Sequence, residues 1–190
     1  LMRRFISWFL GSLLGTPVLG CDLALVLAVD VSGSVDPSEY RIQMDGLAEA
    51  LRDGIVVEAL MDAQAWVTLV QWTGSSRQEA SIDWTQMTSF EDIDAFANLV
   101  SEDPRVWRNY STAIGESLEF SLMALEQVPE CRRKVIDVSG DGVSNEGIEP
   151  REVHKALRAA GITVNAVVIE TGDDHFLRNG RLHAKECGIT

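Results

Sequence analysis

A carboxylate and two hydroxyls stand at alternate positions directly after an apolar segment near the start of the chain. The apolar segment runs from Leu23 to Val29, and Asp30, Ser32 and Ser34 follow it in the sequence DVSGS. A buried strand that ends in this way would deliver three oxygen atoms to one place. Hard oxygen ligands with few charges suit Mg²⁺, or Mn²⁺ in its place. The alternative is a plain turn in which Asp30 and the serines hydrogen-bond to nearby backbone groups.

Two later segments carry the same kinds of side chain. Thr112 lies in YSTAIG, before a helix-like pattern, and Asp141 lies in SGDGVSN, after a strand-like pattern. Ligands of an open parallel sheet lie outside the carboxyl ends of its strands. If the strands that precede Asp30 and Asp141 are neighbours, the two carboxylates meet there, and a cation would relieve their repulsion. The three segments contain no His or Cys, which argues against zinc.

The two later residues each have a simpler interpretation that the sequence leaves open. Thr112 could be the N-cap of the helix that follows it, a role for which Ser111 competes. Asp141 could be a turn residue before a glycine. Whether the three segments lie together in space decides between a metal site and a set of unrelated turns.

The elements around these residues alternate between strand and helix patterns, which is typical of an α/β fold with a mainly parallel sheet. Residues 23–29 are apolar on both faces, as in a central parallel strand. Residues 78–84 are predicted to form an antiparallel edge strand. The other strands are predicted over 66–72, 133–140 and 162–169, and the helices over 36–51, 89–100, 111–128 and 149–161.

Together, the segments DVSGS, TAIG and VIDVSGDGVSN resemble the metal-ion-dependent adhesion site of von Willebrand factor type A domains, over about residues 22–169. The sequence is most similar to a domain-of-unknown-function family of secreted bacterial proteins with such a domain. The resemblance implies an open, doubly wound, mainly parallel sheet of the Rossmann-like kind. It also implies that the carboxylate of a protein ligand completes the coordination of the metal. The residues in the metal-binding positions are Ser32, Ser34 and Thr112 as ligands, with Asp30 and Asp141 holding the ion directly or through water.

The sequence departs from the pattern of these domains in two places. The segment before Thr112 reads RNYST, where such domains often have two glycines, so we expect Tyr110 to narrow the site or to contact a ligand. Asn145, at the end of the third segment, is a second candidate for ligand contact. The family fold also continues with a sixth strand and a closing helix, for which the sequence shows no pattern. We therefore expect the last strand and helix to be missing, and residues 172–190 to be an atypical tail that is truncated or frame-shifted.

Charge and the amino-terminal residues indicate the setting of the protein. The 190 residues suit one domain, and a formal net charge of −13 disfavours nucleic acid as a partner. Residues 1–20 are predicted to be a signal peptide, because Arg3 and Arg4 precede an apolar run that is too short to span a membrane. The domain would then cover residues 21–171, and the protein would be exported, to the periplasm or beyond. The alternatives are a buried helix at 1–20 and a lipid anchor on Cys21.

Cys21 and Cys131 are predicted to form a disulfide. Cys21 lies nine residues before Asp30, and Cys131 lies ten residues before Asp141. If the two strands are parallel neighbours with both aspartates at one end, both cysteines meet at the other end. Export would provide the oxidising compartment that the bond needs. The alternatives are free thiols or lipidation of Cys21, and the third cysteine, Cys187, has no evident partner in the sequence.

These observations favour a metal-dependent binding module that engages a protein ligand, through an acidic side chain of that ligand, without catalysis. The sequence has no G-x-S-x-G elbow, and none of its histidines lies in the three segments. One alternative is an Mg²⁺-dependent phosphatase of the haloacid dehalogenase type with Asp30 as nucleophile, although Ser32 occupies the place of that family's general acid. The other alternative is a structural domain with an empty metal site.

Overall fold

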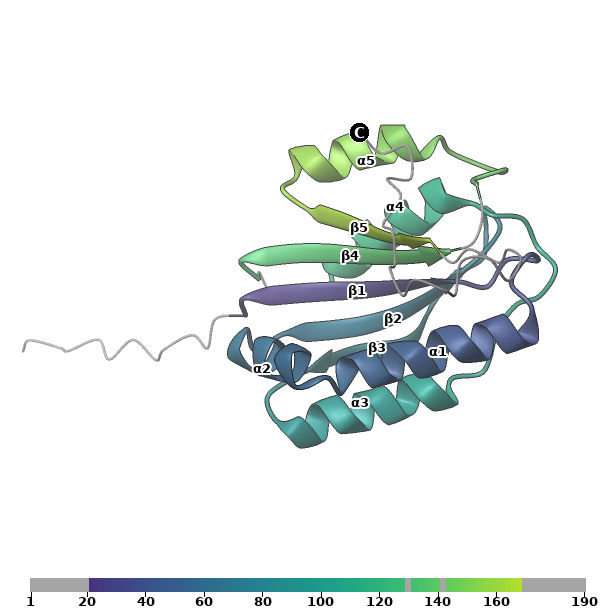
Figure 1. The fold of residues 1–190 in the computed structure, drawn as a ribbon. Coiled ribbons are helices and arrows are strands. Elements are labelled where there is room, and N and C mark those ends of the chain that lie inside the picture. The colour runs from purple at the N-terminus through teal and green to yellow at the C-terminus, as the bar shows by residue number, and fades with distance from the viewer. Residues whose placement is uncertain (1–20, 129–130, 141–142, 169–190) are drawn as a thin grey trace, which may run out of the picture.

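The apolar segment that precedes Ser32 forms β1 (Leu23–Asp30), the middle strand of a five-stranded sheet (Figure 1). The computed structural model describes residues 21–128, 131–140 and 143–168. The other strands are β2 (Trp66–Trp72), β3 (Gln78–Gln86), β4 (Arg133–Gly140) and β5 (Thr163–Val168), in the order β3-β2-β1-β4-β5. The helices are α1 (Pro37–Leu51), α2 (Gly54–Asp62), α3 (Phe90–Glu102), α4 (Ile114–Leu125) and α5 (Pro150–Ala159).

The pairing of the strands confirms the predicted, mainly parallel sheet. β1 runs parallel to β2 and β4, β4 runs parallel to β5, and β3 pairs antiparallel with β2, as predicted for the edge strand. Asp30 lies opposite Trp72 at the end of β2, and Val29 lies opposite Ser139 near the end of β4. The carboxyl ends of β1, β2 and β4 therefore meet at the same edge of the sheet.

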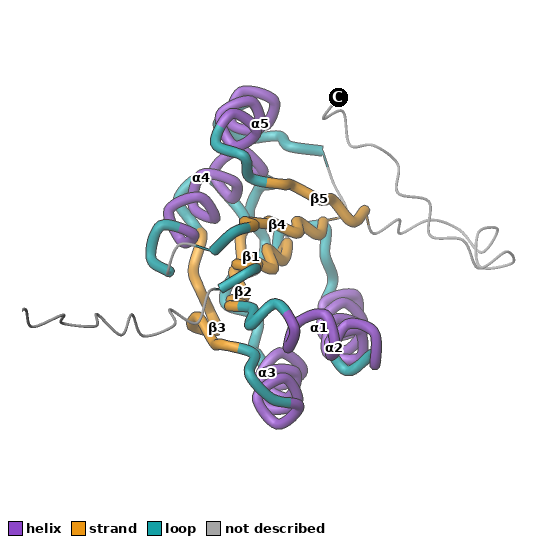
Figure 2. The backbone as a smooth tube through the Cα atoms, turned by 90° about the vertical axis from the view of Figure 1, so that its left-hand side faces the viewer, coloured by secondary structure: helices purple, strands orange, loops and turns teal. Residues whose placement is uncertain are grey.

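Two apolar layers hold the sheet between the helices. Helices α1, α2 and α3 cover one face, and α4 and α5 cover the other (Figure 2). Leu27 and Val29 of β1 pack into the first layer, and Val26 and Ala28 pack into the second. Both faces of β1 are therefore buried, as expected for a central parallel strand, and the strand ends at Asp30, where the apolar run stops.

Helix α1 begins as the sequence predicts. The side chain of Asp36 accepts hydrogen bonds from the backbone N–H groups of Ser38 and Glu39, and the Glu39 carboxylate accepts from the Asp36 N–H at 2.7 Å. This capping box satisfies donors that the first turn of a helix leaves without partners. Ser89 caps α3 by accepting from the N–H of Asp92, also as predicted.

Helix α2 has no counterpart among the predicted elements. Its sequence, GIVVEALMD, is apolar around most of the helix instead of along one stripe, so the amphipathic period that identifies a helix is weak. Ile55 is 80% exposed, whereas Leu60 is buried. Asp53 provides the N-cap by accepting from the N–H of Ile55.

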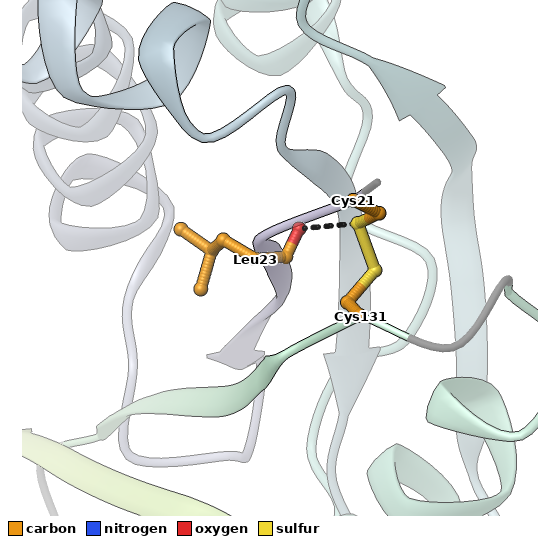
Figure 3. Close-up of a disulfide and its surroundings, with 3 residues drawn as sticks. All are labelled: Cys21, Leu23 and Cys131. Atoms are coloured by element: carbon orange, nitrogen blue, oxygen red, sulfur yellow. Dashed lines mark hydrogen bonds between the residues drawn. A yellow bond between two sulfur atoms is a disulfide. The ribbon is translucent and has the colours of Figure 1, made fainter. Parts of the chain in front are cut away.

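The predicted disulfide between Cys21 and Cys131 is present (Figure 3). The Cα atoms lie 4.6 Å apart, and the N–H of Arg132 donates to the carbonyl of Cys21. The bond therefore joins the amino ends of β1 and β4, opposite the end that carries Asp30. Because the Cys21 sulfur is part of this bond, it cannot also carry a thioether-linked lipid, and the structure does not support the alternative of a lipid anchor there.

Several expectations concern residues outside the described part of the chain. They are the signal peptide at 1–20, the placement of Asp141, and the loss of a last strand and helix with the tail at 172–190, including Cys187. Within the described ranges, no helix is both long enough and apolar enough to cross a membrane.

Candidate metal-binding site

Asp30 ends β1 with its side chain fully buried at the carboxyl edge of the sheet. Its Oδ1 accepts a hydrogen bond from the N–H of Ser32 at 2.7 Å. Gly140, the last residue of β4, passes so close that a Cβ there would lie 2.9 Å from Asp30 Oδ2. The chain therefore enters the Asp141 segment directly beside the Asp30 carboxylate, although Asp141 itself is outside the described residues.

Ser32 and Ser34 converge just beyond Asp30. Their hydroxyl oxygens lie 3.2 Å apart, with Ser32 buried and Ser34 exposed. The N–H of Val35 donates to the carbonyl of Ser32, which closes the turn between them. The turn thus presents two neutral oxygen donors at the surface, next to a buried carboxylate.

Arg105, which no motif in the sequence identifies, holds this turn from the loop after α3. Its guanidinium donates to the backbone carbonyls of Val31, Ser32 and Val35 at 2.7 to 2.9 Å. Burial lowers the pKa of Arg105 from its ordinary value, and the charge of Arg108 lowers it further. One cationic side chain therefore fixes the backbone on both sides of the two hydroxyls.

Thr112 lies in a second loop that is hydrogen-bonded to both of the others. The N–H of Gly33 donates to the carbonyl of Tyr110 at 2.8 Å. This bond joins the Thr112 loop to the turn at residues 32–35, called the serine turn below. The N–H of Thr112 donates to Asn145 Oδ1 at 3.0 Å, and the N–H of Asn145 donates back to the Thr112 carbonyl at 2.9 Å. The structure thus brings Asp30, Ser32, Ser34 and Thr112 onto one connected set of loops.

The alternative role of Thr112 as a helix cap is not what the structure shows. The N-cap of α4 is Ala113, which has no capping side chain, and the N–H of Ile114 donates instead to the Ser144 hydroxyl at 3.3 Å. Among the described residues, no hydrogen bond uses the Thr112 hydroxyl, and the residue is 4% exposed. The hydroxyl is therefore not committed to the helix.

A buried polar network supports the loop that leads to Thr112. Gln71 of β2 donates to Asp103 Oδ2 at 2.7 Å and to the carbonyl of Pro104 at 2.9 Å, and its Oε1 accepts from the N–H of Val106. Tyr40 donates to the carbonyl of Asp103, and its burial raises the pKa of its hydroxyl. Because buried polar groups need all their partners, this network specifies the path of the loop.

Tyr110 and Asn145, the two predicted ligand-contact residues, both line a depression of about 660 Å³ next to the serine turn. Tyr110 is 42% exposed, and the guanidinium carbon of Arg77 lies 3.8 Å from the centre of its ring. Asn109, just before Tyr110, has a φ of 62°, a backbone conformation that glycine adopts easily and asparagine tolerates. Asparagine thus takes a left-handed position in the segment where the resembling domains often carry glycines. The complete lining is Gly33, Arg77, Asn109, Tyr110, Ser111, Asn145 and Glu146.

Glu146 connects this depression to the turn between β2 and β3. Its Oε1 accepts from the Ser75 hydroxyl at 2.6 Å. Hydrogen bonds from Ser75 and Ser111 hold the pKa of Glu146 below its ordinary value. The Glu146 carboxylate is therefore ionised and already bound within the protein.

The described residues contain no group of three or more His, Cys, Asp or Glu side chains that could hold a metal ion. The oxygen groups that the described residues gather in these loops are the carboxylate of Asp30 and the hydroxyls of Ser32, Ser34 and Thr112. That donor set is of the hard, oxygen-only kind.

Residues 20–184 match the family described as "Protein of unknown function (DUF1194)", and the chain belongs to that family. No curated protein matches the sequence. The two proteins below match in structure.

Proximal thread matrix protein 1 (PTMP1) from the mussel byssus matches with a TM-score of 0.63 and 20% identity, over 80% of this chain and 39% of that one. A second structure of PTMP1, with a zinc-occupied MIDAS motif, matches with a TM-score of 0.64 and 20% identity, over 80% of this chain and 40% of that one. The pilus adhesin SpaC from Lactobacillus rhamnosus GG matches with a TM-score of 0.58 and 15% identity, over 82% of this chain and 26% of that one.

These likenesses establish the fold. The chain has the von Willebrand factor type A fold that the sequence predicts. It spans about 40% of the length of PTMP1 and about a quarter of the length of SpaC.

Proposed function

We propose that this member of the DUF1194 family is a divalent-metal-dependent binding module of an exported protein, which engages a protein ligand through a metal-ion-dependent adhesion site. The observation that carries the proposal is the 3.2 Å separation of the Ser32 and Ser34 hydroxyls, immediately beyond the buried carboxylate of Asp30. The proposed metal-binding residues are Asp30, Ser32, Ser34, Thr112 and Asp141.

The chemistry of these donors fits a hard divalent cation. Ser32, Ser34 and Thr112 would contribute neutral oxygens, and Asp30 and Asp141 would balance the charge directly or through water. Mg²⁺ and Mn²⁺ prefer such ligands, so they are the proposed ions. A bound ion would supply a positive charge to which a carboxylate of the ligand can coordinate. The zinc in the PTMP1 site makes Zn²⁺ a useful third ion to test.

A binding role, without catalysis, accounts best for the position of Asp30. A phosphatase nucleophile must reach its substrate, whereas Asp30 is fully buried and its Oδ1 is hydrogen-bonded to the N–H of Ser32. Among the described members of the set, Ser34 is the exposed one, and the three loops contain no histidine that could activate its hydroxyl. We therefore infer that the site acts as a cation-binding surface for a ligand and not as a catalytic centre.

Export is supported by the disulfide and by the predicted signal peptide at 1–20. A Cys21–Cys131 bond persists in an oxidising compartment and is rare in the cytosol. The domain would then begin at Cys21 and extend to about residue 171. Periplasmic and extracellular destinations both satisfy this requirement.

Calorimetric titration with Mg²⁺, Mn²⁺ and Zn²⁺ tests the metal site. We expect one ion to bind per chain, and Ser32→Ala and Asp141→Ala to abolish the heat of binding. Glu119→Gln, which removes an exposed carboxylate from α4, is the matched control and should bind as the unmodified protein does. No heat with any of the three ions would contradict the proposal and favour a structural domain.

A phosphatase assay separates the proposal from its enzymatic alternative. We expect no turnover of p-nitrophenyl phosphate in the presence of Mg²⁺. Turnover that disappears in Asp30→Asn would overturn the binding-only function.

A further inference from the structure

The depression beside the serine turn, called the recess below, is lined by polar and charged side chains and by backbone groups. Gly33 belongs to both the serine turn and the lining of the recess, so a ligand that reaches the proposed metal site also borders this recess. Arg77 lies in its wall, on the tight turn between β2 and β3. The N–H of Thr73 donates to the carbonyl of Arg77 and the N–H of Arg77 donates to the carbonyl of Gly74, so the backbone of this turn is fixed.

The acceptors in the lining are largely used within the protein. Glu146 Oε1 accepts from the Ser75 hydroxyl at 2.6 Å, and Asn145 Oδ1 accepts from the N–H of Thr112 at 3.0 Å. The carbonyl of Tyr110 accepts from the N–H of Gly33. Each of these three acceptors is therefore already engaged by a donor of the protein.

The donors in the lining are largely unused. The Asn145 amide nitrogen enters no hydrogen bond among the described residues, because its carbonyl oxygen is the group that faces Thr112. The Arg77 guanidinium makes one long hydrogen bond, 3.4 Å to the Ser76 hydroxyl, and forms no salt bridge within the described part of the chain. An arginine carries five N–H donors, so most of its capacity is open to a ligand.

Tyr110 holds the Arg77 guanidinium in place by its ring. The 3.8 Å stacking distance orients the planar guanidinium, and the ring attracts its charge. A stacked arginine is well arranged to bind a carboxylate through two parallel hydrogen bonds, which a lysine cannot do.

We propose that this recess is a specificity subsite for a second acidic side chain of the ligand, bound by Arg77 over Tyr110 and assisted by the Asn145 amide. The proposal rests on the proposed function, in which a first carboxylate of the ligand coordinates the metal. The ligand would then be a peptide segment or exposed loop that carries two acidic residues close together. The charge of Glu146 interacts with that of Arg77, but its carboxylate accepts from the Ser75 hydroxyl and forms no salt bridge with Arg77 within the described part of the chain, so the guanidinium donors stay open to a second acid.

Short peptides of defined sequence test the subsite by nuclear magnetic resonance titration in Mg²⁺. Each peptide has capped ends, a glycine–serine background and one aspartate. In one series a second aspartate follows one to four residues later, and in the matched series asparagine replaces that second aspartate. We expect at least one two-acid peptide to bind about tenfold more tightly than its asparagine counterpart, as a charge-assisted bidentate pair would give.

The variants connect this preference to Arg77. Arg77→Gln should remove the preference and leave the affinity for Mg²⁺ unchanged, while Arg77→Lys should retain only part of it. Equal affinity for the paired peptides, or a preference that survives Arg77→Gln, would overturn the subsite. If the protein binds Mg²⁺ but shows no preference for the two-acid peptides, the subsite alone is overturned. If it shows a preference that depends on Arg77 but binds no Mg²⁺, the metal site alone is overturned.

Discussion

Gly140 and Asp30 approach each other so closely that a single added carbon would enter the space of the carboxylate. A Cβ on Gly140 would lie 2.9 Å from Asp30 Oδ2 and 3.5 Å from the ring of Trp72. The end of β4 therefore shapes the position of the acidic group on β1. Position 140 therefore requires a residue without a side chain if the Asp30 carboxylate is to keep its place.

Gly140→Ala should displace the Asp30 carboxylate and weaken metal binding by about tenfold or more, with a loss of about 1–3 kcal/mol in the free energy of unfolding from overpacking. Calorimetry and urea unfolding measure the two effects. Gly46→Ala is the matched control, because nothing lies within 4 Å of a Cβ at that exposed position in α1. The control should stabilise the protein by about 0.5–1 kcal/mol, since alanine favours a helix. Unchanged metal affinity in Gly140→Ala would contradict the prediction.

Arg105→Gln should loosen the turn that carries the two serines. The substitution removes charge-assisted hydrogen bonds to three carbonyls, so we expect the free energy of unfolding to fall by about 2–4 kcal/mol and metal affinity to fall with it. Arg105→Lys should rescue little, because an ammonium group lacks the planar fork of the guanidinium.

Arg132→Gln provides the comparison for Arg105. It removes an exposed ion pair with Asp22, and such pairs contribute about 0–1 kcal/mol. Equal losses of stability in Arg105→Gln and Arg132→Gln, measured by urea unfolding, would show that Arg105 does not support the turn.

The sequence predicts those residues of the candidate site that lie within a few positions of a recognisable strand. An apolar run identifies β1, and the side chains that follow it are placed by the strand itself. The same logic extends to the cysteines, because parallel neighbours of similar length bring Cys21 and Cys131 together once Asp30 and Asp141 are assigned to one end.

The supporting residues could not be predicted in this way. Arg105 binds the carbonyl of Ser32 from 73 positions away, and Gln71 binds Asp103 from 32 positions away. Neither contact leaves a periodic pattern or a local motif, since an arginine in a loop and a glutamine in a strand are ordinary residues. The contact of Arg77 with the Tyr110 ring likewise joins residues far apart in the sequence. Helix α2 was not predicted because its sequence lacks a distinct apolar stripe.

Asp137 of β4 should make stability depend on pH. Burial raises its pKa above the ordinary value of 3.8, and the hydrogen bond from Asn165 offsets this only in part. Between the unfolded and folded pKa values the native state holds the extra proton, so stability falls as pH rises through that window and stays lower above it. Asp137→Asn should therefore increase the free energy of unfolding at about pH 7, with the gain shrinking toward about pH 4.

Urea unfolding across that pH range measures the effect of Asp137→Asn. Asp83→Asn, at an exposed position on β3, serves as the matched control for replacing a strand carboxylate by an amide. A destabilised Asp137→Asn at neutral pH would mean that the ionised carboxylate stabilises β4 and β5.

Loss of the Cys21–Cys131 bond should lower stability without changing the metal site. The bond spans 110 positions, and a cross-link over so long a loop stabilises by about 2–5 kcal/mol, chiefly by restricting the unfolded chain. We expect the double variant Cys21→Ser, Cys131→Ser to lose that amount in urea unfolding and to be insensitive to dithiothreitol, which should destabilise the unmodified protein equally. Its affinity for Mg²⁺ should not change, because the disulfide lies at the amino ends of β1 and β4 and the candidate ligands follow their carboxyl ends. A parallel fall in metal affinity in the folded double variant would show that strain or motion is transmitted along the two strands to the site.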